Sequence, residues 1–165
     1  MTGAPDEALA AVERALAAHG LADRIRVFDV ELPTAAAAAA ELGCEVGAIA
    51  NSLVFRAGDE PVLVLASGAH RVDVAAAGAL FGVDRLRRAD ADTVLRATGQ
   101  AVGGCAPVGH PAPLRTVVDT DLAAFPRLWA GAGIKPAMFW ATYEELLSLT
   151  GGTPAQVGAS IERGS

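Results

Sequence analysis

Two apolar runs in the first half of the chain, residues 49–56 and 61–67, constrain the fold more than any other feature. Both runs are rich in β-branched residues, which favour strands. They are joined by residues 57–60, which include Gly58 and Asp59, a composition typical of the turn between antiparallel strands. The pattern therefore predicts a β-hairpin whose two strands lie at the centre of a sheet.

Helices are predicted on both sides of this hairpin from apolar periodicity and from capping residues. Thr34 can cap a run of six alanines, and alanine has the highest intrinsic helix propensity. Thr142 and Glu145 stand at the spacing of a capping box. The segments predicted to be helical are residues 6–19, 35–42, 73–81, 90–98 and 142–149.

Shorter alternating or apolar segments add further strands at residues 24–30, 85–88, 114–119, 127–130 and 137–140, of which 85–88 can equally be a turn. Because hairpins outnumber regular strand–helix alternation, the expected fold is α/β, with a mixed, mainly antiparallel, barrel-like sheet surrounded by helices. A doubly wound parallel sheet is the alternative. Residues 1–165 are expected to form a single domain whose last dozen residues are frayed.

The cysteines and histidines give little support for a metal centre or a disulfide framework. Cys44 and Cys105 are the two cysteines, and neither lies at ligand spacing from a second cysteine or a histidine. The three histidines, His19, His70 and His110, are scattered along the chain. We therefore expect no metal and no other cofactor.

The start of the chain lacks a basic region followed by an apolar run, and no segment reaches about 18 uninterrupted apolar residues. The protein is accordingly expected to be cytoplasmic and to make no membrane contact. A formal net charge of −6 argues against a protein that coats nucleic acid, DNA included, through an overall basic surface.

Four arginines depart from this acidic composition, because Arg85, Arg87, Arg88 and Arg96 fall within twelve positions. One interpretation is that they are ordinary solvated side chains balanced by neighbouring aspartates. The other is a local patch that contacts phosphate groups, which the net charge does not exclude.

Residues 98–110, with the sequence TGQAVGGCAPVGH, form the segment best suited to chemistry. Four glycines in thirteen residues allow bare backbone to approach a ligand closely. Gly103 and Gly104 can direct main-chain N–H groups into one space, and His110 offers a donor or acceptor near neutral pH. The pattern favours the binding of a carbonyl or an oxyanion, although a loop that only turns a corner would have the same composition. No Gly-Lys-Ser/Thr follows, so a phosphate-binding loop is not indicated.

This segment closely resembles the signature loop of the YbaK and prolyl-tRNA synthetase-associated editing domains. Residues 42–55, LGCEVGAIANSLVF, resemble the first motif of that family, and residues 128–152, LWAGAGIKPAMFWATYEELLSLTGG, resemble its terminal hairpin and helix. The resemblance implies a mixed α/β barrel-like domain that hydrolyses the ester between a wrong amino acid and a tRNA, most often the tRNA for proline. It implies mischarged tRNA as the partner, an aminoacyl-tRNA synthetase as an optional second partner, and activity without metal or nucleotide.

By the same resemblance, main-chain groups of residues 103–107 position the ester carbonyl and the terminal ribose. The candidate catalytic residues are Gly103, Gly104, Cys105, Ala106, Pro107, Gly109 and His110. The candidate substrate-binding residues are Asn51 and Ser52, and the candidate tRNA-binding residues are Arg85, Arg87, Arg88 and Arg96. A thiol nucleophile at Cys105 with His110 as its base is an alternative that requires a hydrogen bond between the two side chains.

One position departs from the family pattern, because many members carry a lysine where this chain has Asn51. The neutral amide suggests a small, hydroxylated or alanine-sized amino acid held by hydrogen bonds, or else a weak activity. Asn51 can also be a residue that merely begins a strand. Three functions remain open: a deacylase acting in trans, a non-catalytic module that binds an aminoacyl end or a synthetase, and an esterase for small aminoacyl esters.

Overall fold

The predicted hairpin forms the middle of the sheet in a computed structural model that describes residues 5–160. Strands β2 (Ile49–Ala57) and β3 (Glu60–Ser67) pair antiparallel, from Ala50 opposite Ser67 to Ala57 opposite Glu60. Every side chain of β3 from Val62 to Ser67 is buried, as expected for a central strand.

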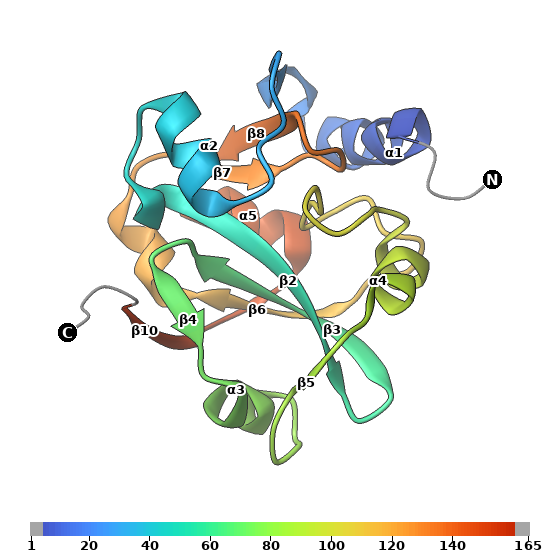
Figure 1. Cartoon of the computed structure of the whole chain (residues 1–165), viewed down its shortest axis with the longest axis vertical. Coiled ribbons are helices and arrows are strands. Elements are labelled where there is room, and N and C mark those ends of the chain that lie inside the picture. The colour runs from blue at the N-terminus through green and yellow to red at the C-terminus, as the bar shows by residue number, and fades with distance from the viewer. Residues whose placement is uncertain (1–4, 161–165) are drawn as a thin grey trace.

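Other strands extend this hairpin into an eight-stranded sheet with the order β1-β8-β7-β2-β3-β6-β9, and β5 pairs with β2 beside that path (Figure 1). The pairs β2–β7, β3–β6 and β6–β9 are parallel, and the remaining pairs are antiparallel, so the predicted mixed, mainly antiparallel sheet is confirmed. These strands are β1 (Ile25–Val27), β5 (Arg87–Arg88), β6 (Arg115–Asp119), β7 (Leu128–Gly131), β8 (Ala137–Ala141) and β9 (Thr153–Ala155). The path ends at β1 and β9, which do not pair with each other, so the sheet is open and the barrel-like closure stays a prediction.

The five predicted helices are present, with the predicted capping residues. Asp73, Asp90 and Thr142 each accept a main-chain N–H at a helix start, and Thr142 and Glu145 form the capping box. The helices are α1 (Pro5–Ala17), α2 (Ala35–Leu42), α3 (Val74–Leu80), α4 (Ala91–Thr98) and α5 (Tyr143–Thr150), with 3-10 turns at η1 (Ala22–Arg24), η2 (Val46–Ala48) and η3 (Thr120–Ala124). Between residues 5 and 160, no helix combines the length and apolar character required to cross a bilayer.

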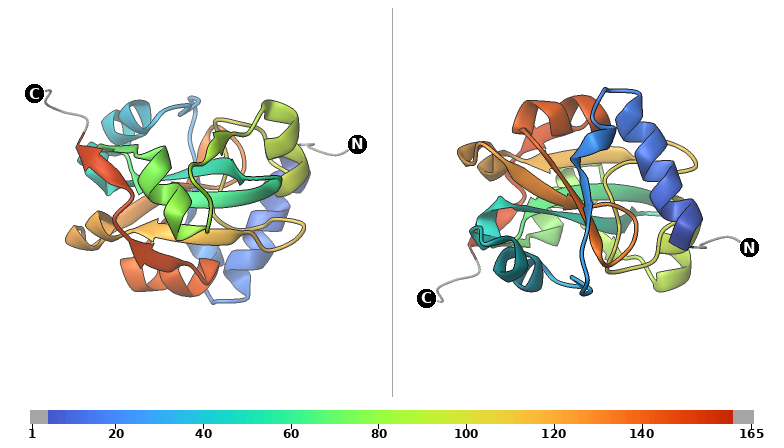
Figure 2. Two further views of the ribbon diagram at one scale, coloured as in Figure 1. Left: turned by 90° about the horizontal axis from the view of Figure 1, so that it is seen from below. Right: turned by 90° about the horizontal axis from the view of Figure 1, so that it is seen from above.

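The helices cover both faces of the sheet because side chains alternate along each strand (Figure 2). On the first face, Leu65, Val118 and Phe139 pack with α1 and α5. On the second face, Val62, Val64 and Val117 pack with α3, and a separate group around Trp129 and Met138 packs with α2. The second face therefore carries two apolar cores rather than one.

A gap in the strand pairing along one side of β2 separates these two cores. Strand β3 occupies one edge of β2, and both β7 and β5 pair with the other edge. Strand β7 pairs only with Ile49 and Ala50, and β5 pairs only with Phe55 and Arg56. Residues 51–54 therefore have no strand beside them on that edge within the described part of the chain.

The C-terminal prediction was wrong over residues 154–160, where β9 pairs with β6, and β10 (Gly158–Ser160) pairs with β4 (His70–Val72). These three-residue strands are stabilised by their partners and carry no apolar period of their own, so no local pattern predicts them. The remaining residues of the predicted frayed end, 161–165, lie outside the described residues. Strand β1 is also shorter than the predicted 24–30.

Candidate active site

A cavity of about 440 Å³ lies at the gap in the edge of β2. Its walls come from β2, from the segment that begins α2, from the residues between β5 and α4, from the loop before Cys105, and from the tip of the β7–β8 hairpin. The apolar part of the wall includes Leu32, Ala35, Ala38, Ile49 and Met138. The gap thus leaves space that an additional strand would otherwise fill.

Five of the candidate residues meet at this cavity, namely Asn51, Ser52, Arg88, Gly103 and Cys105. Asn51 and Ser52 belong to opposite faces of the sheet, because their partners Ala66 and Leu65 lie in different cores. Both nevertheless line the cavity, because it lies beside the part of β2 that has no neighbouring strand on that side. Ser52 Oγ is buried and has no hydrogen-bond partner among the described residues.

The loop that carries Gly103 and Cys105 lies very close to the β7–β8 hairpin, and glycines make this approach possible. A Cβ atom on Gly104 would lie 2.7 Å from the carbonyl carbon of Ile134, and one on Gly131 would lie 2.6 Å from the carbonyl oxygen of Cys105. The N–H of Gly133 donates to the carbonyl oxygen of Gly104 at 2.8 Å. Gly104 is therefore required for packing and, unlike Gly103, is not among the residues that line the cavity.

Two buried polar side chains fix the conformation of the loop. Gln100 is 1% exposed, donates from Nε2 to the Val108 carbonyl oxygen at 3.0 Å, and accepts the Ala106 N–H at 2.6 Å. Thr98 donates from Oγ1 to the Val94 carbonyl oxygen and accepts the Gln100 N–H at 2.9 Å. These bonds hold both ends of the loop to one another.

Several main-chain donors of the loop have no hydrogen-bond partner among residues 5–160. The N–H of Gly104 donates to the Ala101 carbonyl oxygen, and that of Ala106 is bound by Gln100. Within residues 5–160, no hydrogen bond engages the N–H of Gly103 or of Cys105. Both residues line the cavity, as does Val102, whose N–H is likewise unengaged, so main-chain donors of the loop lie beside the space that a ligand would occupy.

The environments of Cys105 and His110 argue against a thiol nucleophile. Cys105 Sγ lies 3.4 Å from the Ala101 carbonyl oxygen, and burial raises the pKa of the thiol, which disfavours the reactive thiolate. His110 Nε2 donates to the Ala106 carbonyl oxygen at 2.9 Å, and burial lowers the pKa of its ring. The histidine is thus bound to the loop backbone and is not among the residues that line the cavity.

The other candidate catalytic residues lie behind the loop. Ala106 is fully buried in the core beneath the first face, and Pro107 is buried beside it. Gly109 has φ of +84°, and a Cβ atom there would lie 3.0 Å from the N atom of Val12 in α1. These residues support the loop from the protein side.

A second hollow adjoins the cavity and shares Arg88, Ala89 and Val102 with it. Arg56, which the sequence analysis did not single out, also lines this hollow and donates from Nε to the Arg88 carbonyl oxygen at 3.3 Å. Hydrogen bonds from Thr93 are the main cause of the lowered pKa of Asp90. Positive charge from Arg96 and Arg56 contributes less.

The four candidate tRNA-binding arginines are thus divided. Arg88 lines both hollows, Arg96 lies near Asp90 at the rim, and Arg87 is exposed on β5. Arg85 lies apart, with its backbone packed against Gly78 of α3.

Lys135 is a further residue near the loop that the sequence analysis did not assign. It is the only lysine of the sequence, and its Cε would lie 3.2 Å from a Cβ atom on Gly103. Its place in the motif at residues 128–152 could have drawn attention to it. Gln100 could have been found as a long polar side chain inside a glycine-rich loop, whereas Arg56 gave no signal beyond its charge.

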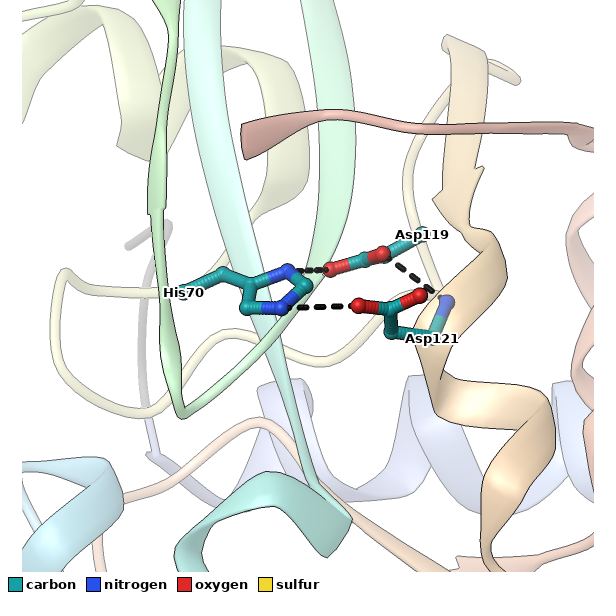
Figure 3. A group of neighbouring side chains, drawn as sticks. All are labelled: His70, Asp119 and Asp121. Carbon is teal, nitrogen blue, oxygen red and sulfur yellow. Dashed lines mark hydrogen bonds and ion pairs between the residues drawn. The ribbon is translucent and has the colours of Figure 1, made fainter. Parts of the chain in front are cut away.

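Outside the cavity, the structure brings together three side chains that sequence spacing did not connect (Figure 3). His70 Nδ1 lies 2.7 Å from Asp119 Oδ2, and His70 Nε2 lies 2.9 Å from Asp121 Oδ2. We call this group the Asp–His–Asp cluster. One ligand atom from each residue lies within 4.8 Å of the others, so the group could hold a metal.

The comparison with known proteins decides the family. A family model described as the aminoacyl-tRNA editing domain matches residues 29–149. The chain belongs to the aminoacyl-tRNA editing domain family. The matched region contains every residue that lines the cavity. The cavity is therefore part of the editing domain.

Two solved structures and one curated protein are similar to this chain over most of its length. A crystal structure described as that of a candidate trans-editing enzyme for prolyl tRNA synthetase is 38% identical, with a TM-score of 0.86, over 93% of this chain and 98% of that one. The crystal structure of the hypothetical protein APE2540 is 30% identical, with a TM-score of 0.82, over 90% and 99%. The uncharacterized protein YwhH of Bacillus subtilis (strain 168) is 29% identical over 72% of this chain and 76% of its own length.

Proposed function

We propose that the protein is a deacylase that acts in trans and hydrolyses the ester between a wrong amino acid and a tRNA. The observation that carries this proposal is that Gly103 and Cys105, whose N–H groups have no partner among residues 5–160, line the same cavity as Asn51 and Ser52. The family membership and the trans-editing description of a 38% identical structure support it. The proposed substrate is the tRNA for proline carrying a small amino acid.

The chemical step needs a site for the negative charge that develops on the ester carbonyl oxygen. Water adds to the carbonyl carbon, the bond from that carbon to the ribose oxygen breaks, and the water proton passes to the departing ribose oxygen. The N–H groups of Gly103 and Cys105 are proposed to donate to the carbonyl oxygen as its charge grows. Removal of one such donor typically lowers an enzyme's rate by about 10²–10³.

No thiol intermediate is proposed, because the pKa of Cys105 is raised and its Sγ lies beside a carbonyl oxygen. The protein instead positions the ester and water relative to each other, as the fixed loop conformation allows. We further propose that no metal takes part. The Asp–His–Asp cluster, the one metal-ligating group found among residues 5–160, lies outside the cavity wall.

The preference for a small amino acid rests on the composition of the cavity. Asn51 and Ser52 are neutral polar groups, and the opposing wall of Leu32, Ala38 and Met138 is apolar. Ser52 Oγ has an unsatisfied hydrogen-bonding capacity that a hydroxyl or ammonium group of the substrate would satisfy. Arg88 and Arg56, in the adjoining hollow, are proposed to bind the phosphate of the terminal nucleotide.

The experiment that tests this proposal measures release of amino acid from alanyl-, seryl-, threonyl- and cysteinyl-tRNA for proline, with prolyl-tRNA as the matched reference. We expect release from at least one small mischarged substrate to exceed release from the prolyl-tRNA, and chelation of metals to leave it unchanged. Hydrolysis of free aminoacyl esters without hydrolysis of any charged tRNA would instead identify a small-molecule esterase. Binding of charged tRNA without release would identify a non-catalytic module.

A further inference from the structure

A row of arginines stacked on aromatic rings lies on the second face of the sheet. The guanidinium carbons of Arg24 and Arg127 lie 3.7 and 4.0 Å from the ring centroid of Trp140. Two guanidinium groups this close to one centroid require opposite faces of the ring, so the indole lies between them. The guanidinium carbon of Arg26 lies 4.9 Å from the centroid of Phe28 and 5.8 Å from that of Trp129.

This arginine–aromatic row, consisting of Arg24, Arg26 and Arg127 with their rings, continues directly from the cavity. Arg26 of β1 lies opposite Met138 of β8, and Met138 lines the cavity. Trp140 is two residues further along β8 and therefore on the same face. Because neighbouring strands are about 4.8 Å apart, Arg26 lies about one strand spacing beyond the cavity wall.

The three arginines differ in whether their charge is already neutralised. Arg24 forms a two-pronged ion pair with Glu145, at 3.0 and 3.3 Å. Among the described residues, neither Arg26 nor Arg127 forms an ion pair, and both side chains are exposed. Stacking fixes the plane of a guanidinium group but leaves its N–H edge available to an anion.

We propose that Arg26 and Arg127 bind phosphates of the acceptor arm of the RNA whose aminoacyl end occupies the cavity. The identity of that RNA rests on the proposed function. A planar, orientationally fixed guanidinium matches the geometry of a phosphate, and two such groups on one side of the cavity fit a polyanion better than a peptide or a neutral surface. The net charge of the chain is −6, so two unpaired arginines in this row are a local basic feature, and such a feature can orient a bound nucleic acid.

The row and the hollow of Arg56 and Arg88 have separate roles in this arrangement. The hollow adjoins the cavity and contacts the terminal nucleotide, which every substrate contains. The row lies further away and contacts only a substrate that is long enough to reach it. Substrate length therefore distinguishes the two sets of arginines.

The test combines the substitutions Arg26→Gln and Arg127→Gln and measures kcat/KM on a mischarged tRNA and on an aminoacylated CCA trinucleotide. We expect kcat/KM to fall about ten- to a hundred-fold on the tRNA and to stay within about two-fold on the trinucleotide, since the lost hydrogen bonds are charged but exposed. The logarithmic dependence of tRNA affinity on salt should become shallower by about two units for two lost phosphate contacts. The matched control is Arg115→Gln, because Arg115 also stacks on an aromatic ring, Phe81, but is paired with Glu60 at 2.7 Å.

Equal kcat/KM values for the double variant and the unaltered protein on the tRNA would overturn the inference. Equal losses of kcat/KM on the tRNA and on the trinucleotide would also overturn it, because they would indicate a structural role for the row. Affinity for uncharged tRNA, measured by fluorescence anisotropy, separates this inference from the proposed function. If the unaltered protein binds tRNA through the row but releases no amino acid, the proposed function fails and the inference stands. A second variant with Arg26→Lys and Arg127→Lys should retain part of the affinity, because the charge remains without the planar fork.

Discussion

The loop at residues 98–110 and the Asp–His–Asp cluster both carry polar groups, and they differ in how many of those groups have a hydrogen-bond partner in the protein. In the cluster, the fully buried Asp119 accepts hydrogen bonds from the N–H groups of Ser67 and Asp121 and lies beside His70. In the loop, the N–H groups of Gly103 and Cys105, two of the residues that line the cavity, have no partner within the described residues.

This difference separates stability from function. An unsatisfied buried polar group costs about 1–3 kcal/mol, so a fold retains it most readily where a ligand can supply the missing partner. A fully satisfied cluster needs no ligand and joins the elements that carry it, here β4 and the β6–η3 junction. Substitutions in the cluster should therefore change stability alone, and substitutions at the cavity should change turnover.

The largest expected effect is a loss of stability at the cluster. Asp119→Ala removes a buried carboxylate and should lower the free energy of unfolding by about 3–5 kcal/mol, because breaking a buried pair leaves its partners unsatisfied. Asp121→Ala, at a side chain that is 51% exposed, is the control and should lower it by less than about 1 kcal/mol. Urea unfolding measures both, and similar losses would show that burial does not distinguish the two carboxylates.

The next effect distinguishes two adjacent glycines of the loop. Gly104→Ala should lower stability by about 1–3 kcal/mol, because its Cβ would meet the backbone of residues 134 and 135. Gly103→Ala meets only the flexible Lys135 side chain, although φ of +97° adds strain. We expect Gly103→Ala to lose more deacylation rate than stability. Thermal melts and deacylation rates of the same samples measure the two losses. A larger loss of rate than of stability for Gly104→Ala, with the opposite for Gly103→Ala, would place Gly104 at the ligand.

A smaller effect concerns the polar wall of the cavity. Asn51→Ala should lower the deacylation rate about ten- to a hundred-fold, equivalent to about 1.4–2.7 kcal/mol, with little change in stability. Ser52→Ala should leave stability unchanged or raise it, because the buried hydroxyl has no protein partner. Rates on a panel of aminoacyl-tRNAs check the first expectation. Unchanged rates for both variants would mean that this wall does not contact substrate.

The smallest expected effect is a pH dependence of stability from His110. Burial lowers the pKa of His110 in the folded protein, so the unfolded chain binds a proton more readily as pH falls through about 6.5. Stability should therefore decrease on acidification below that pH and recover as pH rises. In His110→Gln this contribution should vanish, and the difference between the two unfolding curves isolates it from the other histidines. Parallel curves would contradict the expectation.

The fold was predictable where local signals were strong. The hairpin, the alanine-rich helix after Thr34 and the capping box at Thr142 all follow from short-range chemistry that acts within a few residues. The strands β4, β9 and β10 were not predictable, because each is a short edge segment defined only by its partner. The gap in the β2 edge was missed for the same reason, since it depends on where two distant strands end.

The candidate site was predictable at the level of the loop and less so at the level of individual atoms. The family resemblance assigned Asn51 and Gly103 to one site, and both residues line the same cavity. It did not show that Gly104 packs against the hairpin or that Ala106 gives its N–H to Gln100. The packing of Gly104 depends on a contact between segments about thirty residues apart, as does the proximity of Lys135 to the loop, and the Gln100–Ala106 bond depends on how the loop folds back on itself.

The central claim, that unpartnered main-chain donors at the sheet gap receive the ester, is tested most directly by amide NMR shifts. A suitable probe is an adenosine that carries alanine in an amide linkage to the ribose, because this bond resists hydrolysis and retains the carbonyl. We predict that the probe shifts the amide signals of Gly103 and Cys105 and leaves those of Ser67 and Asp121, which are bound within the cluster, unchanged. Saturable binding that leaves Gly103 and Cys105 unshifted would contradict the account.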